Sequence, residues 1–326
     1  MPGPGCCVRD GRRASTGIGH VKGVTLDRQH WHVTTVAAAN APGRGLDTAF
    51  VPAPHLVTDL GVLFGGDCLA ILPLVAEGSV DTVFADPPFN LGKSYGPGCA
   101  DAMTEADYVA WCQRWLAECI RVLAPGGALF VYNLPRWNIR LGAWLMDRGL
   151  TFRHDIAVRV ASGFPIPGRL YPAHYSLLYL TKGKPARFRS IRTPVETCRH
   201  CDGDVKDYGG YRGKLNPNGI NLTDVWDDIP PVRHAKFKAD GRSANALSTK
   251  LLERVVEIST RRGDLVLDPF GGSGTTYAVC EARGRRWVGM DIDFAPVIAR
   301  RLRSGTVKGH LNRDWVEPDA PALAAE

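Results

Sequence analysis

The feature that most constrains the fold of this chain is a short apolar run that ends at two adjacent prolines, residues 80–90 (VDTVFADPPFN). β-Branched and aromatic residues fill the run, which predicts a buried parallel strand. Proline has a fixed φ and no amide hydrogen, so Pro87 and Pro88 end the strand in a stiff turn. We therefore expect Asp86 at the carboxyl end of a strand, where open α/β sheets bind their ligands.

The residues at this turn suit a planar group that bears an NH2. The carboxylate of Asp86 and a proline carbonyl can accept its two hydrogens, and the ring of Phe89 can stack on its face. Because the motif is short, an ordinary strand end with a Pro-Pro turn stays open as the alternative.

A second motif lies far downstream, at residues 264–276 (DLVLDPFGGSGTT). Strand, glycine-rich turn and helix predict the first βα unit of a nucleotide-binding sheet, where glycines let the backbone approach a ligand closely. The next strand ends at Asp291, about 20 residues past the glycines, the spacing expected for a carboxylate on a ribose hydroxyl. No Gly-Lys-Ser/Thr follows, so the turn is not a phosphate-binding P-loop. The candidate cofactor-binding residues here are Asp268, Phe270, Gly271, Gly272, Gly274, Thr275 and Asp291.

Together the two motifs resemble those of the DNA amino-methyltransferases, which use S-adenosylmethionine (SAM) to methylate N6 of adenine or N4 of cytosine. Asp-Pro-Pro-Phe comes first and Phe-Gly-Gly-Ser-Gly last, as in the permuted β group, whose target-recognition region lies between them. The resemblance covers roughly residues 60–303. It implies an α/β fold: a doubly wound, mostly parallel Rossmann-like sheet with an antiparallel edge strand and an inserted recognition region.

The resemblance also implies roles for single residues. Asp86, Pro87, Pro88 and Phe89 would be catalytic, holding the amine of a base flipped out of the duplex, mostly by positioning and electrostatics. Phe89 replaces the commoner Tyr, so stacking survives and a hydroxyl contact is lost. Asp before Pro-Pro favours N6 of adenine over N4 of cytosine. Asp67 matches an acid that contacts the adenine of SAM, although it also suits a helix N-cap, and both roles stay open.

Local patterns predict two further elements of the catalytic half. Thr104 and Asp107 resemble a capping pair, and apolar residues then repeat at helical spacing up to Leu123. Two strands follow one another between His154 and Leu180 with no helix between them. This predicts an antiparallel pair at a sheet edge.

We expect five segments along the 326 residues. Residues 1–57 are rich in Gly, Pro, Ala and Arg without a sustained period, which predicts a largely disordered arm. Residues 58–182 would form the catalytic half, 183–241 the inserted target-recognition region, 242–316 the SAM-binding half, and 317–326 a loose tail.

The 183–241 region mixes basic residues with tyrosines, which fits contacts to phosphates and bases; a loop-rich insertion without readout is the alternative. The basic residues at its start are Lys184, Arg187, Arg189 and Arg192. Cys198 and Cys201 form a Cys-x-x-Cys, which is half of a tetrahedral zinc site. No second such pair exists, so we predict no metal and keep these cysteines as the candidates for a structural zinc.

Composition narrows the class and the compartment. The net charge of +7 favours polyanionic partners, and the resemblance implies double-stranded DNA, with a cognate restriction endonuclease as a further candidate partner. The nine cysteines are odd in number and scattered, which is typical of reduced thiols in a cytosolic protein. No apolar run is long enough to span a membrane, and no signal peptide is evident. We expect a cytoplasmic enzyme.

Three other functions share part of these features. An NAD-dependent oxidoreductase would share the glycine turn and Asp291 but leaves the Asp-Pro-Pro-Phe motif unexplained. A methyltransferase of RNA or of protein glutamine would share the chemistry, but usually carries its glycine motif first. A nucleic-acid-binding module would need only the insertion, and would keep its function after Asp86→Ala.

Overall fold

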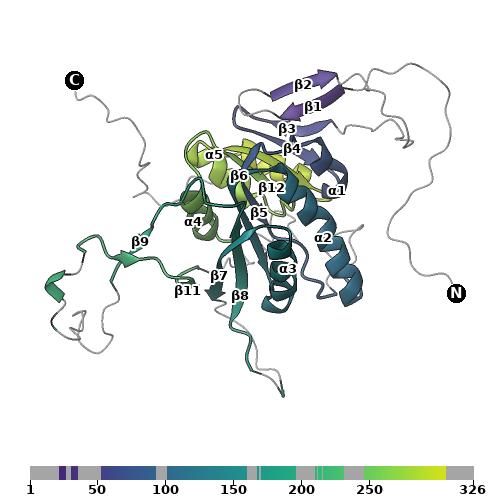
Figure 1. Cartoon of the computed structure of the whole chain (residues 1–326). Helices are drawn as coiled ribbons and strands as arrows, with labels where there is room; N and C mark the ends of the chain where they lie inside the picture. The colour runs from purple at the N-terminus through teal and green to yellow at the C-terminus, as the bar shows by residue number, and fades with distance from the viewer. Residues whose placement is uncertain are drawn as a thin grey trace, which may run out of the picture.

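A nine-stranded mixed sheet forms the centre of the computed structural model, in the strand order β11-β7-β8-β6-β5-β12-β13-β4-β3 (Figure 1). The structure describes residues 22–26, 31–35, 53–92, 101–159, 167–168, 170–195, 210, 212–214, 216–230 and 246–305. The strands of the sheet are β3 (Pro54–Val57), β4 (Gly61–Gly65), β5 (Val80–Ala85), β6 (Leu123–Asn133), β7 (Thr151–Arg159), β8 (His174–Thr181), β11 (Val225–Trp226), β12 (Leu265–Asp268) and β13 (Arg286–Asp291).

Five adjacent strands, β6, β5, β12, β13 and β4, run parallel to one another. Their carboxyl ends therefore meet at one edge of the sheet. The first strand predicted from the sequence, β5, lies between β6 and β12, so both of its neighbours are parallel strands. This central position explains why nearly all of its side chains are buried.

Helices cover both faces of the sheet. One layer holds α1 (Cys68–Ile71), the 3-10 turn η1 (Leu72–Leu74), α2 (Glu105–Val122) and α3 (Pro135–Asp147); the other holds α4 (Thr249–Ser259), α5 (Thr275–Arg283) and α6 (Ala295–Arg303). Successive strand residues point to opposite faces, so Val83 packs in the first layer and Phe84 in the second. None of the described helices is long and apolar enough to cross a membrane.

The predicted capping pair is confirmed at the start of α2. The Asp107 amide donates to Thr104 Oγ1 at 3.2 Å, and that hydroxyl donates to Asp107 Oδ2 at 2.7 Å. The four cysteines in the described ranges, Cys68, Cys112, Cys119 and Cys280, are all free and buried. Burial raises the pKa of each thiol, which keeps these side chains neutral parts of the core.

The predicted antiparallel pair is confirmed as β7 and β8, but its place at the sheet edge is wrong. Strand β8 also pairs antiparallel with β6, so it lies inside the sheet. The two-residue strand β11 then pairs in parallel with β7 and covers it. The antiparallel strand at an edge is β3, on the opposite side. The difference arises because an edge strand with unpaired backbone groups recruits a further partner, here from the insertion.

The prediction of a disordered arm over 1–57 is wrong for three strands. β1 (Lys22–Leu26) and β2 (Trp31–Thr35) pair antiparallel as a separate two-stranded sheet, and β3 joins the main sheet beside β4. The physical reason is hydrogen bonding: a short connection lets two β-rich segments satisfy each other's backbone groups, and the edge of β4 offers the same to β3.

The insertion contributes little regular structure. Its described elements, besides β11, are β9 (Arg192–Thr193), the 3-10 turn η2 (Arg212–Lys214) and β10 (Ile220–Asn221). Strands β9 and β10 pair antiparallel as a second small sheet.

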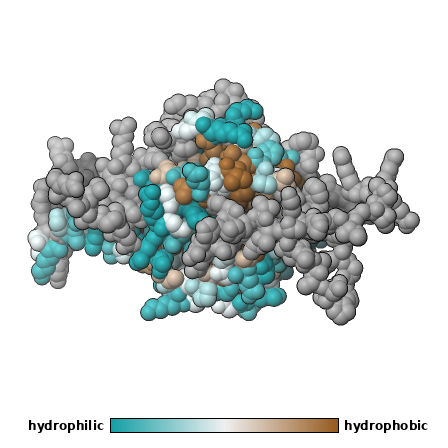
Figure 2. All heavy atoms as spheres, turned by 90° about the horizontal axis from the view of Figure 1, so that it is seen from above, coloured by the Kyte–Doolittle hydropathy of each residue, from teal (hydrophilic) through white to brown (hydrophobic). Residues whose placement is uncertain are grey.

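Figure 2 shows the molecule from above, with an apolar patch among hydrophilic atoms.

Two arginines at the start of the insertion pair with acids of the other half of the domain. Arg187 Nε lies 3.7 Å from Asp264 Oδ2, and Arg189 NH1 lies 2.9 Å from Glu257 Oε1. These two arginines therefore tie the insertion to the core, and the phosphate contacts that the sequence suggests for this region stay a prediction. In contrast, Arg192 donates to a backbone carbonyl within the insertion.

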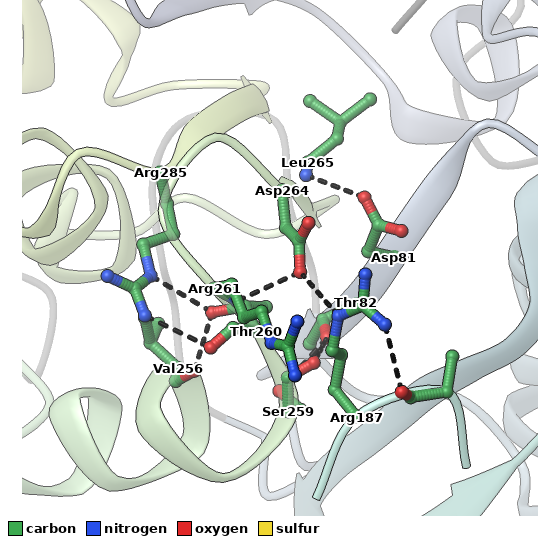
Figure 3. Close-up of polar contacts among 11 residues, drawn as sticks. Asp81, Thr82, Arg187, Val256, Ser259, Thr260, Arg261, Asp264, Leu265 and Arg285 are labelled. Carbon is green, nitrogen blue, oxygen red and sulfur yellow. Dashed lines mark hydrogen bonds and ion pairs between the residues drawn. The ribbon is translucent and has the colours of Figure 1, made fainter. Parts of the chain in front are cut away.

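The pair of Arg187 and Asp264 lies at the amino end of the strands, as Figure 3 shows. There the amide of Leu265 donates to Asp81 at 2.9 Å, which joins the start of β12 to the start of β5. The hydroxyl of Thr82 bonds that of Ser259, at the end of α4, at 2.9 Å. Structural contacts thus join the elements at this end of the sheet.

Residues 226–228 of the insertion are tied to α4. Arg254 donates two hydrogen bonds to Asp228, and Lys250 donates a third at 2.6 Å. Burial raises the pKa of Asp228, but the hydrogen bonds from the two cations outweigh burial and lower the pKa to about 2. The Arg254 guanidinium also lies 5.3 Å from the ring of Trp226, which is buried. The start of the insertion and its residues 226–228 are therefore held on the SAM-binding half of the predicted domain.

Candidate active site

The two sequence motifs meet at the carboxyl edge of the sheet. Asp86 follows β5, Asp268 ends the neighbouring strand β12, and Asp291 ends β13 beyond it. Burial raises the pKa of Asp86 and of Asp268; the charge of Asp268 raises that of Asp86 further, and the charge of Asp291 that of Asp268. Residues that are about 200 positions apart in the chain thus form one acidic site, as the position of both motifs at strand ends predicts.

Asp86 is held as an available acceptor. Burial raises the pKa of its carboxyl group well above its ordinary value, and the charge of Asp268 adds to the effect. Within the described ranges the carboxylate has no hydrogen-bond partner. Its surroundings therefore leave it to a group that is not part of the chain.

The backbone that follows Asp86 is fixed by side chains from other elements. Tyr108, on α2, donates its hydroxyl hydrogen to the Pro88 carbonyl at 2.6 Å, and Asn133 in turn donates to the Tyr108 oxygen at 2.9 Å. The indole of Trp137, on α3, donates to the Phe89 carbonyl at 2.9 Å. In contrast, the Pro87 carbonyl has no donor among the described residues. The two carbonyls after Pro87 are occupied, and its own carbonyl stays available beside Asp86.

The turn is completed by a carboxylate. Asp101 accepts hydrogen bonds from the amides of Asn90 and Leu91, at 2.5 and 2.9 Å. Asn90 has a positive φ of 55°, and its side chain bonds the backbone of Met103 in both directions. Asn can adopt this left-handed backbone more readily than most residues. Sequence reasoning missed Asp101, Tyr108 and Trp137, because no local signal links them to the motif.

Tyr108→Phe is expected to lower kcat about fivefold to tenfold, because the Pro88 carbonyl loses its donor and the loop loses one neutral hydrogen bond. The Kd for SAM should stay within twofold. Stopped-time methyl-transfer assays and isothermal titration would measure the two quantities. A thermal unfolding curve controls for loss of the fold, and an unchanged kcat would show that Tyr108 does not position the loop.

The glycine turn has the shape that the sequence predicts. Gly272 and Gly274 have positive φ angles of 51° and 73°. A Cβ at Gly271 would lie 2.6 Å from the Tyr277 hydroxyl, and one at Gly274 would lie 2.8 Å from the Ile298 side chain. The turn therefore requires glycine at these positions. Thr275 begins α5 directly after it.

Phe270 points away from the turn into the core. Its ring lies 5.7 Å from that of Trp111 and 5.0 Å from that of Trp115, both on α2. The side chain thus anchors the start of the turn against the first helical layer. At Phe270, therefore, the turn presents backbone groups to a cofactor, and not the side chain.

Asp291 organises the turn as well as facing the site. Its Oδ2 accepts the Gly272 amide at 2.7 Å, and its Oδ1 accepts the amides of Asp293 and Phe294 at 2.9 and 2.7 Å. Burial raises the pKa of the carboxyl group, against these hydrogen bonds, which lower it. The next residue, Ile292, is 55% exposed, an apolar side chain at the site that sequence reasoning missed.

Asp67 serves as a helix cap. The Leu69 amide donates to Asp67 Oδ1 at 2.9 Å, at the start of α1. This confirms one of the two roles that the sequence left open. Asp67 follows β4, which pairs with β13, so it lies at the same sheet edge as Asp291.

Asp268 lies beneath the other acids. It is 2% exposed, and its Oδ1 accepts the Phe270 amide at 2.9 Å. Burial raises its pKa to about 7, against the hydrogen bonds from Thr276 and Phe270, and the charge of Asp291 raises it further. A buried carboxyl group that is half ionised near neutral pH suits a site that receives a positive charge.

The zinc candidates Cys198 and Cys201 lie outside the described residues. Among the residues that are described, no group of three or more His, Cys, Asp or Glu side chains could hold a metal ion.

Comparison with known proteins gives one family. The DNA methylase family of N6 and N4 methyltransferases matches residues 80–295. The chain is 52% identical over 252 residues to the Type II methyltransferase M.BamHI of Bacillus amyloliquefaciens. The matched residues make up 77% of this chain and 59% of that protein. It is 30% identical over 256 residues to the DNA adenine methyltransferase YhdJ of Escherichia coli strain K12, covering 76% and 84%.

A solved structure has the same fold. The PvuII DNA methyltransferase (cytosine-N4-specific) superposes with a TM-score of 0.56 and 21% identity, over 82% of this chain and 92% of that one. At this identity the likeness concerns the arrangement of helices and strands.

Proposed function

The chain belongs to the DNA methylase family, and from this premise we propose that it transfers a methyl group from SAM to the exocyclic amine of a base at specific sites in double-stranded DNA. The observation that carries the proposal is the pair of free acceptors at one turn. Asp86 and the Pro87 carbonyl have no partners in the described structure, while the two carbonyls that follow them do.

The chain's own residues would act by positioning. An exocyclic amine is a poor nucleophile because its lone pair is delocalised into the ring. Asp86 and the Pro87 carbonyl would accept its two hydrogens and direct the lone pair outward, while Phe89 supports the ring. The amine is hidden in a stacked duplex, so the base must be flipped out. SAM, when bound, supplies a methyl group that its sulfonium already activates.

The residues at the sheet edge fit SAM. Asp291 would hold a ribose hydroxyl through Oδ2, which accepts one amide, whereas its Oδ1 already accepts two. Asp67 and Ile292 would contact the adenine, one through hydrogen bonding and the other through its exposed apolar surface. Burial raises the pKa of Asp86 and Asp268, and a cation bound beside them would favour their ionised forms, which in turn would stabilise the cation.

N6 of adenine is the first candidate for the target atom, because Asp stands before Pro-Pro in the motif. N4 of cytosine is the second candidate, because the matching family includes enzymes of both kinds. We further propose a cognate restriction endonuclease as partner, since a site-specific methyl group would protect DNA from such an enzyme. The cytoplasm is the compartment that provides both DNA and SAM.

Methyl transfer from labelled SAM to unmethylated genomic DNA tests the proposal, with the product digested and its nucleosides identified by mass. N6-methyladenine supports the first candidate. N4-methylcytosine keeps the chemistry and replaces the base. A SAM-binding protein that leaves every DNA unlabelled would contradict the proposal and direct attention to RNA.

The pH dependence of SAM binding follows from Asp268. Its pKa of about 7, raised by burial, means that the folded protein without cofactor holds a proton there which an unfolded chain releases near pH 4. The unfolding free energy should therefore fall as pH rises from 4 to 7. A bound sulfonium favours the ionised carboxylate, so SAM binding releases this proton. The Kd for SAM should fall about tenfold per pH unit up to pH 7 and level off above it.

S-adenosylhomocysteine, which lacks the positive charge, is the matched control for this prediction. Calorimetric titrations across the same pH range should give it a much weaker pH dependence. Asp268→Asn should flatten the SAM curve. Equal slopes for the two ligands would show that Asp268 does not sense the sulfonium.

A further inference from the structure

Two tyrosines stand beside Asp86 and form one aromatic wall with Phe89. Tyr132 is near the end of β6, and Tyr175 is on β8. The ring of Phe89 lies 5.4 Å from that of Tyr175 and 6.1 Å from that of Tyr132, and the two tyrosine rings are 5.3 Å apart. All three pairs are tilted by about 50°. The rings contact one another, so the wall offers a ligand its outer surface.

Strand pairing explains why the wall stands at the catalytic turn. Ala85 of β5 is opposite Val131 of β6, so the residues that follow, Asp86 and Tyr132, are neighbours. Strand β8 brings Tyr175 to the same end of the sheet, where its neighbour Ser176 pairs with Asn133.

The hydroxyl groups of this wall have no protein partner in the described structure. Tyr132 is only 7% exposed, and Tyr175 is half-buried. Burial raises the pKa of both phenols, and the charge of Asp86 raises it further, which shows that both lie within its electrostatic reach. Tyr108 on α2, in contrast, uses its hydroxyl within the protein. A hydroxyl without a partner among the described residues is available to a ligand, so its presence at a substrate site points to a partner in the substrate.

We propose that the hydroxyls of Tyr132 and Tyr175 bind the edge of the flipped base next to its amino group, and so restrict the target to adenine or cytosine. This inference rests on the function proposed above. On the Watson–Crick edge of both bases a ring nitrogen that accepts hydrogen bonds adjoins the NH2 group, whereas guanine presents a ring N–H beside its NH2 group and thymine presents a ring N–H between two carbonyls. Two acceptors at Asp86 and Pro87, followed by a hydroxyl donor, match the first pattern and oppose the second.

The wall also accounts for a feature of the motif. Phe89 stands where a tyrosine is commoner, and so brings no hydroxyl to the base. Tyr132 and Tyr175 contact the Phe89 ring and bring two. The polar contact is thus supplied from β6 and β8 and not from the motif itself.

Tyr132→Phe and Tyr175→Phe test the proposal, because each keeps its ring and removes only a hydroxyl. We expect kcat/KM for DNA to fall about tenfold in at least one variant, with the Kd for SAM unchanged. Tyr179→Phe is the matched control. Tyr179 is on the same face of β8, its hydroxyl is buried without a partner in the described structure, and its ring stacks on Phe130 at 4.4 Å. This variant should keep the wild-type kcat/KM.

A substrate analogue separates contact with the base from a general structural role. Once the methylated position is mapped, DNA is prepared in which the ring nitrogen beside the amine is replaced by C–H (1-deazaadenine or 3-deazacytosine). The kcat/KM of the wild type should be about tenfold lower on this DNA than on normal DNA. The affected Tyr→Phe variant, which is already about tenfold slower on normal DNA, should lose no further activity on the analogue. Additive losses would overturn the contact.

The outcomes distinguish this inference from the function on which it rests. A wild-type protein that methylates no DNA overturns both. A wild type that methylates DNA, with both Tyr→Phe variants as active as Tyr179→Phe, overturns only the role of the two hydroxyls.

Discussion

Asp86→Ala is expected to lower kcat for methyl transfer by about 100-fold to 1000-fold, the largest effect of any single change at this site. The variant removes the carboxylate that would accept one N–H of the target amine. No other side chain in the described structure forms a hydrogen bond at Asp86, so none can take over the role of the lost carboxylate. Single-turnover transfer of labelled methyl groups to DNA would measure the loss.

The fold and the cofactor site should survive this change. The Pro88 and Phe89 carbonyls keep their donors, so the loop stays in place. The Kd for SAM should change by less than about threefold, because Asp268 still provides negative charge. Asp86→Asn, which keeps one oxygen acceptor in the same shape, should fall between the wild type and Asp86→Ala. A near wild-type rate for Asp86→Ala would remove Asp86 from the chemistry.

Asp291→Ala is expected to weaken SAM binding about 100-fold. The variant would lose the hydrogen bond between the carboxylate and the ribose. It would also lose the bond from the Gly272 amide, which Asp291 accepts at 2.7 Å. Two lost charge-assisted hydrogen bonds account for an effect of this size. At saturating SAM, kcat should fall far less, because the catalytic turn is on another strand. Calorimetric titration with SAM measures the first quantity.

Asp293→Ala is the matched control for this prediction. Its carboxyl group is two residues away, and no hydrogen bond of its side chain within the described structure would be lost. The Kd for SAM should stay within twofold of the wild type. If Asp291→Ala bound SAM as tightly as this control, Asp291 would have no contact with the ribose.

The amino-acid sequence by itself determined the local chemistry of the site. Two prolines after a β-branched run must end a strand, so Asp86 had to lie at a strand end. A strand, a glycine-rich turn and a helix predict a nucleotide-binding unit because glycine adopts positive φ angles, as at Gly272 and Gly274, at little cost. These inferences hold without tertiary structure because they depend on neighbours in the chain.

The partners of these residues were decided only by the tertiary structure. Tyr108 and Trp137 come from 20 and 48 residues away to hold two carbonyls, and Tyr132 reaches Asp86 because β6 lies beside β5. Likewise, the ion pair between Arg187 and Asp264 is evident only in the folded chain. Periodicity tells which face of an element is buried, but strand order and register decide what that face meets. Contacts between distant segments therefore became visible only in the folded chain.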